Sequence, residues 1–228
     1  MARKAMGQPA WSTGLNRKPE RVQAILQALR AYYPDARLIL NFENPYQLLV
    51  AAILAAQATD ERVNQVTPAV FQRYPTPRHM AEADPSDLEA RIRPTGYYRQ
   101  KARFLIECCR AIVERFHGEV PDRLEDLTQL PGVGKKTALL VLNHAFRKPS
   151  GIVVDTHMHR VAQRLDWSHE QDRDRMEEEL RALIPPASWV EASPLIAFHG
   201  RRHCKAPRPL CTGCPIEDLC YFPEKHFR

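Results

Sequence analysis

Four cysteines close to the end of the chain constrain its fold more than any other feature. Cys204, Cys211, Cys214 and Cys220 are separated by six, two and five residues. The basic N-terminus has no apolar block long enough for a secretory signal, so we expect a cytoplasmic protein whose thiols stay reduced. A metal explains the four thiols better than disulfides do, and tetrahedral zinc and an iron–sulfur cluster both take four thiolates. The spacing therefore predicts a metal site that closes a small C-terminal unit.

Apolar side chains recur at helical spacing through nearly the whole chain. Val22, Ile25 and Leu29, for example, share one face of a helix predicted over residues 22–33. Residues 45–74 begin with a proline at a first-turn position and are apolar enough to form one central, buried helix. Three shorter helices are predicted over residues 85–93, 99–116 and 122–130, and Cys108 and Cys109 fall in the second of these as small buried hydrophobes.

A capping pattern predicts a further helix in the last third of the chain. Gln171 follows Ser168 at the spacing of a capping box. We expect the pair to start a helix over residues 172–184, in which Met176 and Leu180 share an apolar face. Short β-branched runs such as 151–154 are too isolated to build a sheet. The fold class that these patterns predict is all-α.

Charge and hydropathy limit what the chain can contact. The net charge is +6, and residues 1–37 hold seven Lys or Arg against two Asp or Glu, while residues 199–208 hold four cations and no acid. Such patches suit a polyanion, because each cation that meets a phosphate releases a condensed counterion, although solubility is a simpler explanation. The longest apolar run, residues 48–56, is about half of the roughly 20 residues that a membrane-spanning helix requires. We therefore predict no membrane contact.

The stretch LPGVGKKTALLVL, residues 130–142, predicts a tight turn between two helices. Gly132 and Gly134 permit left-handed backbone and close approach between chain segments. The N–H groups at the start of the second helix form an anion site suited to one DNA or RNA phosphate. A nucleotide-binding P-loop does not fit, because Gln129 stands where its first glycine is required and Lys136 where it needs Ser or Thr.

Lys136 lies within the first turn of that second helix. The positive end of the helix dipole and the neighbouring Lys135 both disfavour a charged ammonium there, which favours the neutral amine. A neutral lysine amine is a nucleophile that forms Schiff bases with carbonyl carbons. The alternative is that both lysines only contact phosphate, and composition alone favours that alternative.

Three motifs in this order resemble the endonuclease III family of DNA glycosylases, part of the helix-hairpin-helix superfamily of base-excision repair enzymes. They are LPGVGKKTA (130–138), VVDTHMHRV (153–161) and the C-terminal cysteine spacing. The similarity also covers residues 41–64 and 95–102, so that it extends from about residue 20 to the end.

The resemblance implies two helical domains with damaged double-stranded DNA bound in the cleft between them. A six-helix domain over residues 38–148 would carry the hairpin. A discontinuous domain, made of residues 19–37 and 149–228, would hold a [4Fe-4S] cluster, with zinc as the less favoured metal. Residues 1–18 would form a flexible basic arm.

The resemblance also implies roles for single residues. Lys136 corresponds to the nucleophile that attacks C1′ of the damaged nucleotide, and Asp155 to the carboxylate that deprotonates Lys136 or stabilises positive charge on the sugar. Asp155 is equally suited to cap the helix that follows it. Gln57 corresponds to a residue inserted into the duplex, and Tyr97 stands where the family commonly has a leucine wedge. Further DNA contacts are implied for Gly132, Gly134, Lys135 and His157, and for Lys205 and Arg208 in the loop between the first two cysteines.

The function that the resemblance implies is that of a bifunctional DNA N-glycosylase and AP lyase. Such an enzyme, expected to act as a monomer in the bacterial nucleoid, removes oxidised pyrimidines of the thymine glycol type and cleaves the abasic site by β-elimination. Adenine glycosylases generally lack the lysine at position 136 and carry a catalytic Glu where this chain has Ile53. 8-Oxoguanine glycosylases typically lack the four cysteines. A non-catalytic DNA-binding module that carries the cluster is the remaining alternative.

Overall fold

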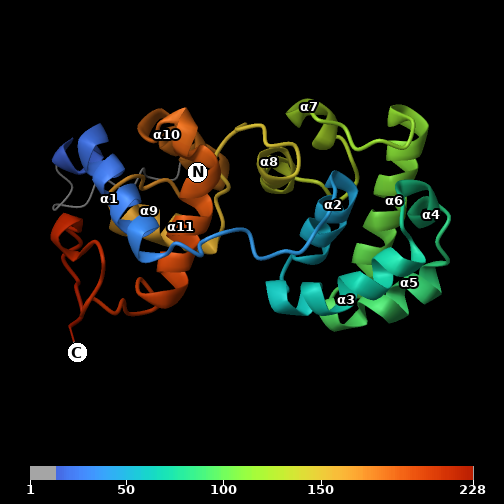
Figure 1. Cartoon of the computed structure of the whole chain (residues 1–228), viewed down its shortest axis with the longest axis horizontal. Helices are drawn as coiled ribbons and strands as arrows, with labels where there is room; N and C mark the ends of the chain where they lie inside the picture. Colours follow the sequence, from blue (N-terminus) through green and yellow to red (C-terminus); the bar gives the residue numbers. More distant parts are fainter. Residues whose placement is uncertain (1–13, 228) are drawn as a thin grey trace, which may run out of the picture. The chain divides into compact units, whose positions relative to one another are not determined.

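The computed structural model describes residues 14–227, and all of its regular structure within that range is helical (Figure 1). The prediction of an all-α fold is confirmed. No helix in the same range is long and apolar enough to cross a membrane. The chain divides into two compact units, one formed by residues 38–150 and the other by residues 14–37 together with 151–227.

The unit of residues 38–150 is described completely and holds seven α-helices, where the resemblance implied six. Several of them begin with proline in the first turn and with a capping side chain that accepts a backbone N–H. The helices are α2 (Pro45–Leu54), α3 (Asp60–Arg73), α4 (Pro77–Ala81), α5 (Pro85–Ile92), α6 (Tyr98–Phe116), α7 (Leu124–Leu127) and α8 (Lys135–His144), with a 3-10 turn η2 (Arg93–Thr95) before α6.

The predicted single helix over residues 45–74 is wrong, because it is interrupted between α2 and α3. Thr59 starts α3 by accepting a hydrogen bond from the backbone N–H of Arg62 at 3.3 Å. Gln57 has a φ of 55°, a left-handed conformation that an α-helix does not accommodate. The interruption leaves the Gln57 side chain exposed.

Helix α2 lies at the centre of this unit and packs against α3, α6 and α8. Leu48, Leu49 and Val50 point in successive directions around the helix and are all buried, which explains why the sequence is apolar on every face. Burial of each such side chain contributes roughly 1.5–3 kcal/mol. Cys108 and Cys109 of α6 belong to the same core as predicted, and burial raises the pKa of Cys108 to about 12.

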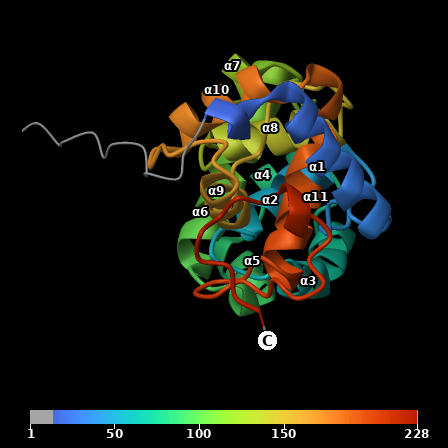
Figure 2. The ribbon, with the colours of Figure 1, turned by 90° about the vertical axis from the view of Figure 1, so that its left-hand side faces the viewer.

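The other unit brings the two ends of the described chain together. Helices α1 and α11, far apart in sequence, lie side by side, and α11 also packs against α9 (Figure 1 and Figure 2). The predicted face of α1 is confirmed, since Val22, Ile25 and Leu29 are fully buried. The elements are η1 (Gly14–Arg17), α1 (Pro19–Tyr32), α9 (Thr156–Arg164), α10 (Arg173–Leu183), η3 (Pro186–Ser188), α11 (Trp189–Arg202) and η4 (Glu217–Leu219).

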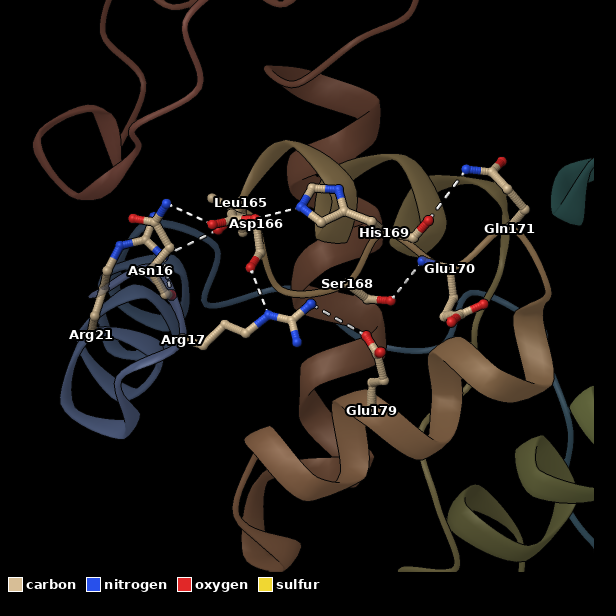
Figure 3. Close-up of polar contacts among 10 residues, drawn as sticks. All are labelled: Asn16, Arg17, Arg21, Leu165, Asp166, Ser168, His169, Glu170, Gln171 and Glu179. Atoms are coloured by element: carbon tan, nitrogen blue, oxygen red, sulfur yellow. Dashed lines mark hydrogen bonds and ion pairs between the residues drawn. The ribbon is translucent and has the colours of Figure 1, made fainter. Parts of the chain in front are cut away.

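Residues 14–18 belong to the folded unit, although the sequence placed them in a flexible arm. Asn16 is only 1% exposed, and its Nδ2 donates to Asp166 Oδ2 at 2.7 Å (Figure 3). Arg17 Nε donates to the backbone carbonyl of Asp166 at 3.3 Å. The remainder of the predicted arm, residues 1–13, lies outside the described residues.

The predicted capping box at Ser168 and Gln171 is also wrong. Asp172 caps α10 instead, and its Oδ1 accepts the backbone N–H groups of Asp174 and Arg175, both at 3.0 Å. Ser168 Oγ accepts the N–H of Glu170 within the preceding turn (Figure 3). Two capping residues compete here, and the aspartate one position before the helix is better placed to reach its first turn.

Candidate active site and metal centre

The predicted turn between two helices is present between α7 and α8. Val133 N–H donates to the carbonyl of Leu130 at 3.1 Å, which closes the turn. Gly132 has a φ of 76°, and a Cβ at this position would lie 2.8 Å from Cβ of Phe104 on α6. Glycine is therefore required twice, for the left-handed backbone and for the close approach to α6.

The start of α8 is open toward solvent. Gly134 is its N-cap residue, offers no side-chain acceptor to the first turn, and has no atom within 4 Å of the place where a Cβ would stand. Lys136, the second residue of the helix, is exposed, and Lys135 is half-buried. Backbone N–H groups, the helix dipole and a lysine amine thus meet at one accessible surface, which suits a phosphate or an electrophilic sugar carbon.

Asp155 caps α9, as its position before that helix predicted. One carboxylate oxygen, Oδ1, accepts the N–H of His157 at 2.9 Å and that of Met158 at 2.7 Å. The extended segment that leads to it is held by buried side chains, since Glu177 Oε1 accepts the N–H of Ile152 and Ser193 Oγ that of Val153. The half-buried carboxylate is therefore fixed in orientation. It lies in a different unit from Lys136, so the pairing of these two groups stays a prediction.

Four exposed residues other than glycine have left-handed backbone in the unit that carries the hairpin, and Gln57 and Tyr97 are two of them. Gln57 has a φ of 55° and Tyr97 a φ of 49°, and the Tyr97 side chain is 63% exposed. A left-handed non-glycine residue costs roughly 1–2 kcal/mol, so such positions persist only where the surrounding structure fixes them. Both are positions for which the family resemblance implied insertion into DNA, and that role stays a prediction.

The four cysteines near the end of the chain line one pocket, together with apolar side chains from α9 and the C-terminal segment. Within residues 14–227, no three His, Cys, Asp or Glu side chains come close enough together to hold a single metal ion. Two of the sulfurs have a hydrogen-bond donor beside them: Arg164 Nη1 lies 3.3 Å from Cys204 Sγ, and the backbone nitrogen of His226 lies 3.3 Å from Cys211 Sγ. Burial raises the pKa of Cys214 to about 11, which favours neutral thiols until a cation binds.

Two arginines that the sequence analysis did not single out organise the chain around Cys204. Arg160 donates to the carbonyls of Cys204 and Gly200, and its Nη2 lies 3.1 Å from Nδ1 of His157. Arg164 donates to the carbonyls of Cys204, Lys205 and Pro207. The loop that carries the exposed cations Lys205 and Arg208 is therefore fixed to α9. No local sequence pattern predicts that these arginines anchor the loop, because the contacts join residues about forty positions apart.

Comparison with known proteins agrees with these features. Residues 50–186 match the family model of the HhH-GPD superfamily base excision DNA repair protein. The endonuclease III of Synechocystis sp. is 48% identical over 203 residues, which cover 89% of this chain and 93% of that protein. Two solved structures, a non-covalent endonuclease III–DNA complex and a trapped endonuclease III–DNA covalent intermediate, each give a TM-score of 0.84 at 38% identity, over 89% of this chain and 95% of theirs.

Three features define the class of protein to which this chain belongs. They are an all-helical fold, a glycine turn between two helices, and an exposed lysine at the start of the second helix. The chain belongs to the HhH-GPD superfamily of base excision DNA repair proteins. Within that superfamily, its similarity to the named relatives places it in the endonuclease III family.

Proposed function

We propose that the protein is a bifunctional DNA glycosylase and AP lyase that removes oxidised pyrimidines from duplex DNA. The observation that carries this proposal is Lys136, an exposed amine in the first turn of α8, directly after the glycine turn. Related structures that contain DNA, one of them a covalent intermediate, support the same reaction class. The test is a duplex with a single thymine glycol, from which the protein should release both the free base and a strand cut on the 3′ side.

The proposed chemistry uses two side chains of this chain. Lys136 Nζ attacks C1′, the bond from C1′ to the base breaks, and the base leaves with the electron pair and takes up a proton. Loss of the amine proton and opening of the sugar ring give an imine between Nζ and C1′. Removal of a C2′ proton then expels the 3′ phosphate by β-elimination. Asp155 accepts the proton from Lys136 or stabilises positive charge on the sugar, held for that role by the first turn of α9.

Four cysteines that line one pocket, together with membership in the endonuclease III family, support a [4Fe-4S] cluster in preference to zinc. Zinc would need four sulfurs about 2.3 Å from one ion and therefore roughly 3.8 Å from each other. A cluster instead takes one thiolate on each of four irons, so its four sulfurs can stand farther apart around one pocket, and the four cysteines here line one pocket. When bound, such a cluster would crosslink the C-terminal segment and hold the basic loop between Cys204 and Cys211 in one position. Cys204, Cys211, Cys214 and Cys220 would hold it, and Arg164 would donate to one of its thiolates.

Two features oppose the monofunctional alternative and the non-catalytic one. At position 53, where adenine glycosylases have a catalytic Glu, this chain has Ile53, which is 4% exposed and belongs to the core. Position 136 holds lysine, which those enzymes generally lack. A monomer would carry both proposed catalytic residues, Lys136 and Asp155, and we propose that the protein acts in that form. The proposed substrate, damaged chromosomal DNA, agrees with a cytoplasmic protein of the bacterial nucleoid.

Replacement of Asp155 by asparagine separates its two roles. Asparagine caps a helix about as well as aspartate, so the free energy of unfolding should change by less than about 1 kcal/mol. The loss of negative charge should slow base release by roughly 10²- to 10⁴-fold in single-turnover assays. Asp172→Asn is the matched control, because Asp172 caps α10 through the same pair of N–H contacts. Equal rates for Asp155→Asn and the native protein would limit Asp155 to capping.

Replacement of Tyr97 by alanine tests the proposed insertion into the duplex. Base–aromatic stacking contributes roughly 1–3 kcal/mol, so affinity for a lesion-containing duplex should fall about 5- to 150-fold. Tyr97→Phe keeps the ring and should retain most of that affinity. Fluorescence anisotropy at constant salt measures the binding. If Tyr97→Ala leaves both lesion affinity and turnover unchanged, Tyr97 is not the wedge.

A further inference from the structure

Lys101 is a buried lysine in the first turns of α6, and its Nζ joins two chain segments. Nζ donates to the carbonyl of Leu54 and to the carbonyl of Thr95, both at 2.8 Å. The residue is only 4% exposed, and burial lowers its pKa. Among the described residues, no ion pair between its ammonium and a carboxylate is found. Both partners are instead backbone carbonyls at helix ends, where the helix dipole is negative.

The two carbonyls mark the points at which the exposed loops begin. Leu54 is the last residue of α2, and the turn after it carries Gln57. Thr95 is the last residue of η2 and is followed by Gly96 and Tyr97. One ammonium thus holds the base of both loops.

The Tyr97 loop has further fixed points close to Lys101. The backbone N–H of Lys101 donates to the carbonyl of Tyr97 at 3.0 Å. The buried hydroxyl of Thr95 donates to the carbonyl of Ile92 at 2.8 Å. These bonds hold the chain on both sides of the left-handed residue. The Gln57 loop is tied to the Tyr97 loop by Nζ of Lys101.

We propose that Lys101 is a positioning residue that fixes the Gln57 loop and the Tyr97 loop at one separation, so that both side chains enter the duplex together. The inference rests on the proposed function, in which these two side chains insert at the lesion. Lys101 would itself touch no DNA, but it would set the separation of the two side chains that recognise the damage. Buried charge held only by carbonyls is expensive, which agrees with a role beyond local stability.

The test uses the full-length protein and a duplex with one thymine glycol opposite 2-aminopurine. Insertion unstacks the 2-aminopurine and raises its fluorescence, which stopped-flow mixing follows in time. Lys101→Met should lower the rate constant of insertion about tenfold, which corresponds to about 1.4 kcal/mol, the scale of one or two hydrogen bonds. Lys101→Arg, which keeps the charge and the donors, should recover most of the rate. Lys148→Met, at an exposed lysine of the same unit, is the matched control.

A double-mutant cycle separates positioning from general stability. In a Tyr97→Ala background, Lys101→Met should lower the remaining signal less than about twofold, because the loop it positions has lost its inserting side chain. A native-like rate for Lys101→Met, or the same tenfold loss in the Tyr97→Ala background, would overturn the inference. If Lys101→Met does not fold at the assay temperature by circular dichroism, Lys101→Gln, which keeps a donor, is measured in the same cycle. Absence of any fluorescence change with the native protein would contradict the proposed insertion itself.

Discussion

Replacing Lys136 by glutamine should abolish strand cleavage at a preformed abasic site. An abasic site needs no base removal, so the assay isolates the steps that require the imine between Nζ and C1′. Glutamine keeps the length and polarity of the side chain but cannot form that imine. Loss of a covalent nucleophile typically lowers turnover by several orders of magnitude, and we expect a loss on the order of 10⁴-fold or more.

The matched control is the neighbouring lysine. Lys135→Gln removes one cation from the same helix start, so binding should weaken and its salt dependence should fall by about one unit of slope. Cleavage by bound enzyme should persist in this variant. Residual cleavage by Lys136→Gln at the native rate would assign the nucleophile to another amine, and loss of cleavage in both variants would favour phosphate binding as the role of the pair.

Replacing Cys214 by serine should remove the metal and release the C-terminal segment. Binding of a structural zinc ion contributes roughly 10–16 kcal/mol in zinc-finger peptides, and the loss of one of four ligands should forfeit much of the corresponding metal contribution here. The purified variant should contain little iron and lack the visible absorption of an iron–sulfur cluster. Its affinity for duplex DNA should fall more than about tenfold, since the loop with Lys205 and Arg208 is anchored beside Cys204.

Cys108→Ala is the control for the loss of a thiol elsewhere. Cys108 is buried in α6, belongs to the other unit and lines no pocket with the four cysteines. This variant should retain iron and DNA affinity, at a moderate cost in stability from the cavity. Full iron content and native affinity in Cys214→Ser would contradict the assignment of that cysteine. Stoichiometric zinc without visible absorption in the native protein would replace the cluster by the alternative metal.

Local patterns in the sequence predicted several of the helices and the glycine turn, but no helix at α4 or α11. Periodicity located α1 and α6 because their buried faces recur at the helical repeat, as Val22 and Ile25 show. Gly132 was identified from its neighbours, and the approach of Phe104 explains why no other residue fits there. Asp155 as a helix cap needed only its place directly before the amphipathic stretch of residues 156–165.

Features that depend on distant contacts could not be predicted in this way. The apolar character of residues 45–74 continues through the interruption after Leu54. The chain is held there in part by a hydrogen bond to the carbonyl of Leu54 from Lys101 Nζ, forty-seven positions away. The attachment of Asn16 depends on Asp166, and the anchoring of the basic loop depends on Arg164. In each case a side chain forms a hydrogen bond with a residue that is distant in sequence, so no local sequence pattern predicts the contact.

The proposed reaction requires a lysine of this protein to form an imine with damaged DNA. We would incubate the native protein with a duplex that contains one thymine glycol, add borohydride, and separate the products on a denaturing gel. The predicted result is a protein–DNA adduct whose linkage maps to Lys136 by peptide mass analysis and is missing in Lys136→Gln. No adduct on either this lesion or an abasic site would contradict the proposed reaction and leave a monofunctional or non-catalytic protein.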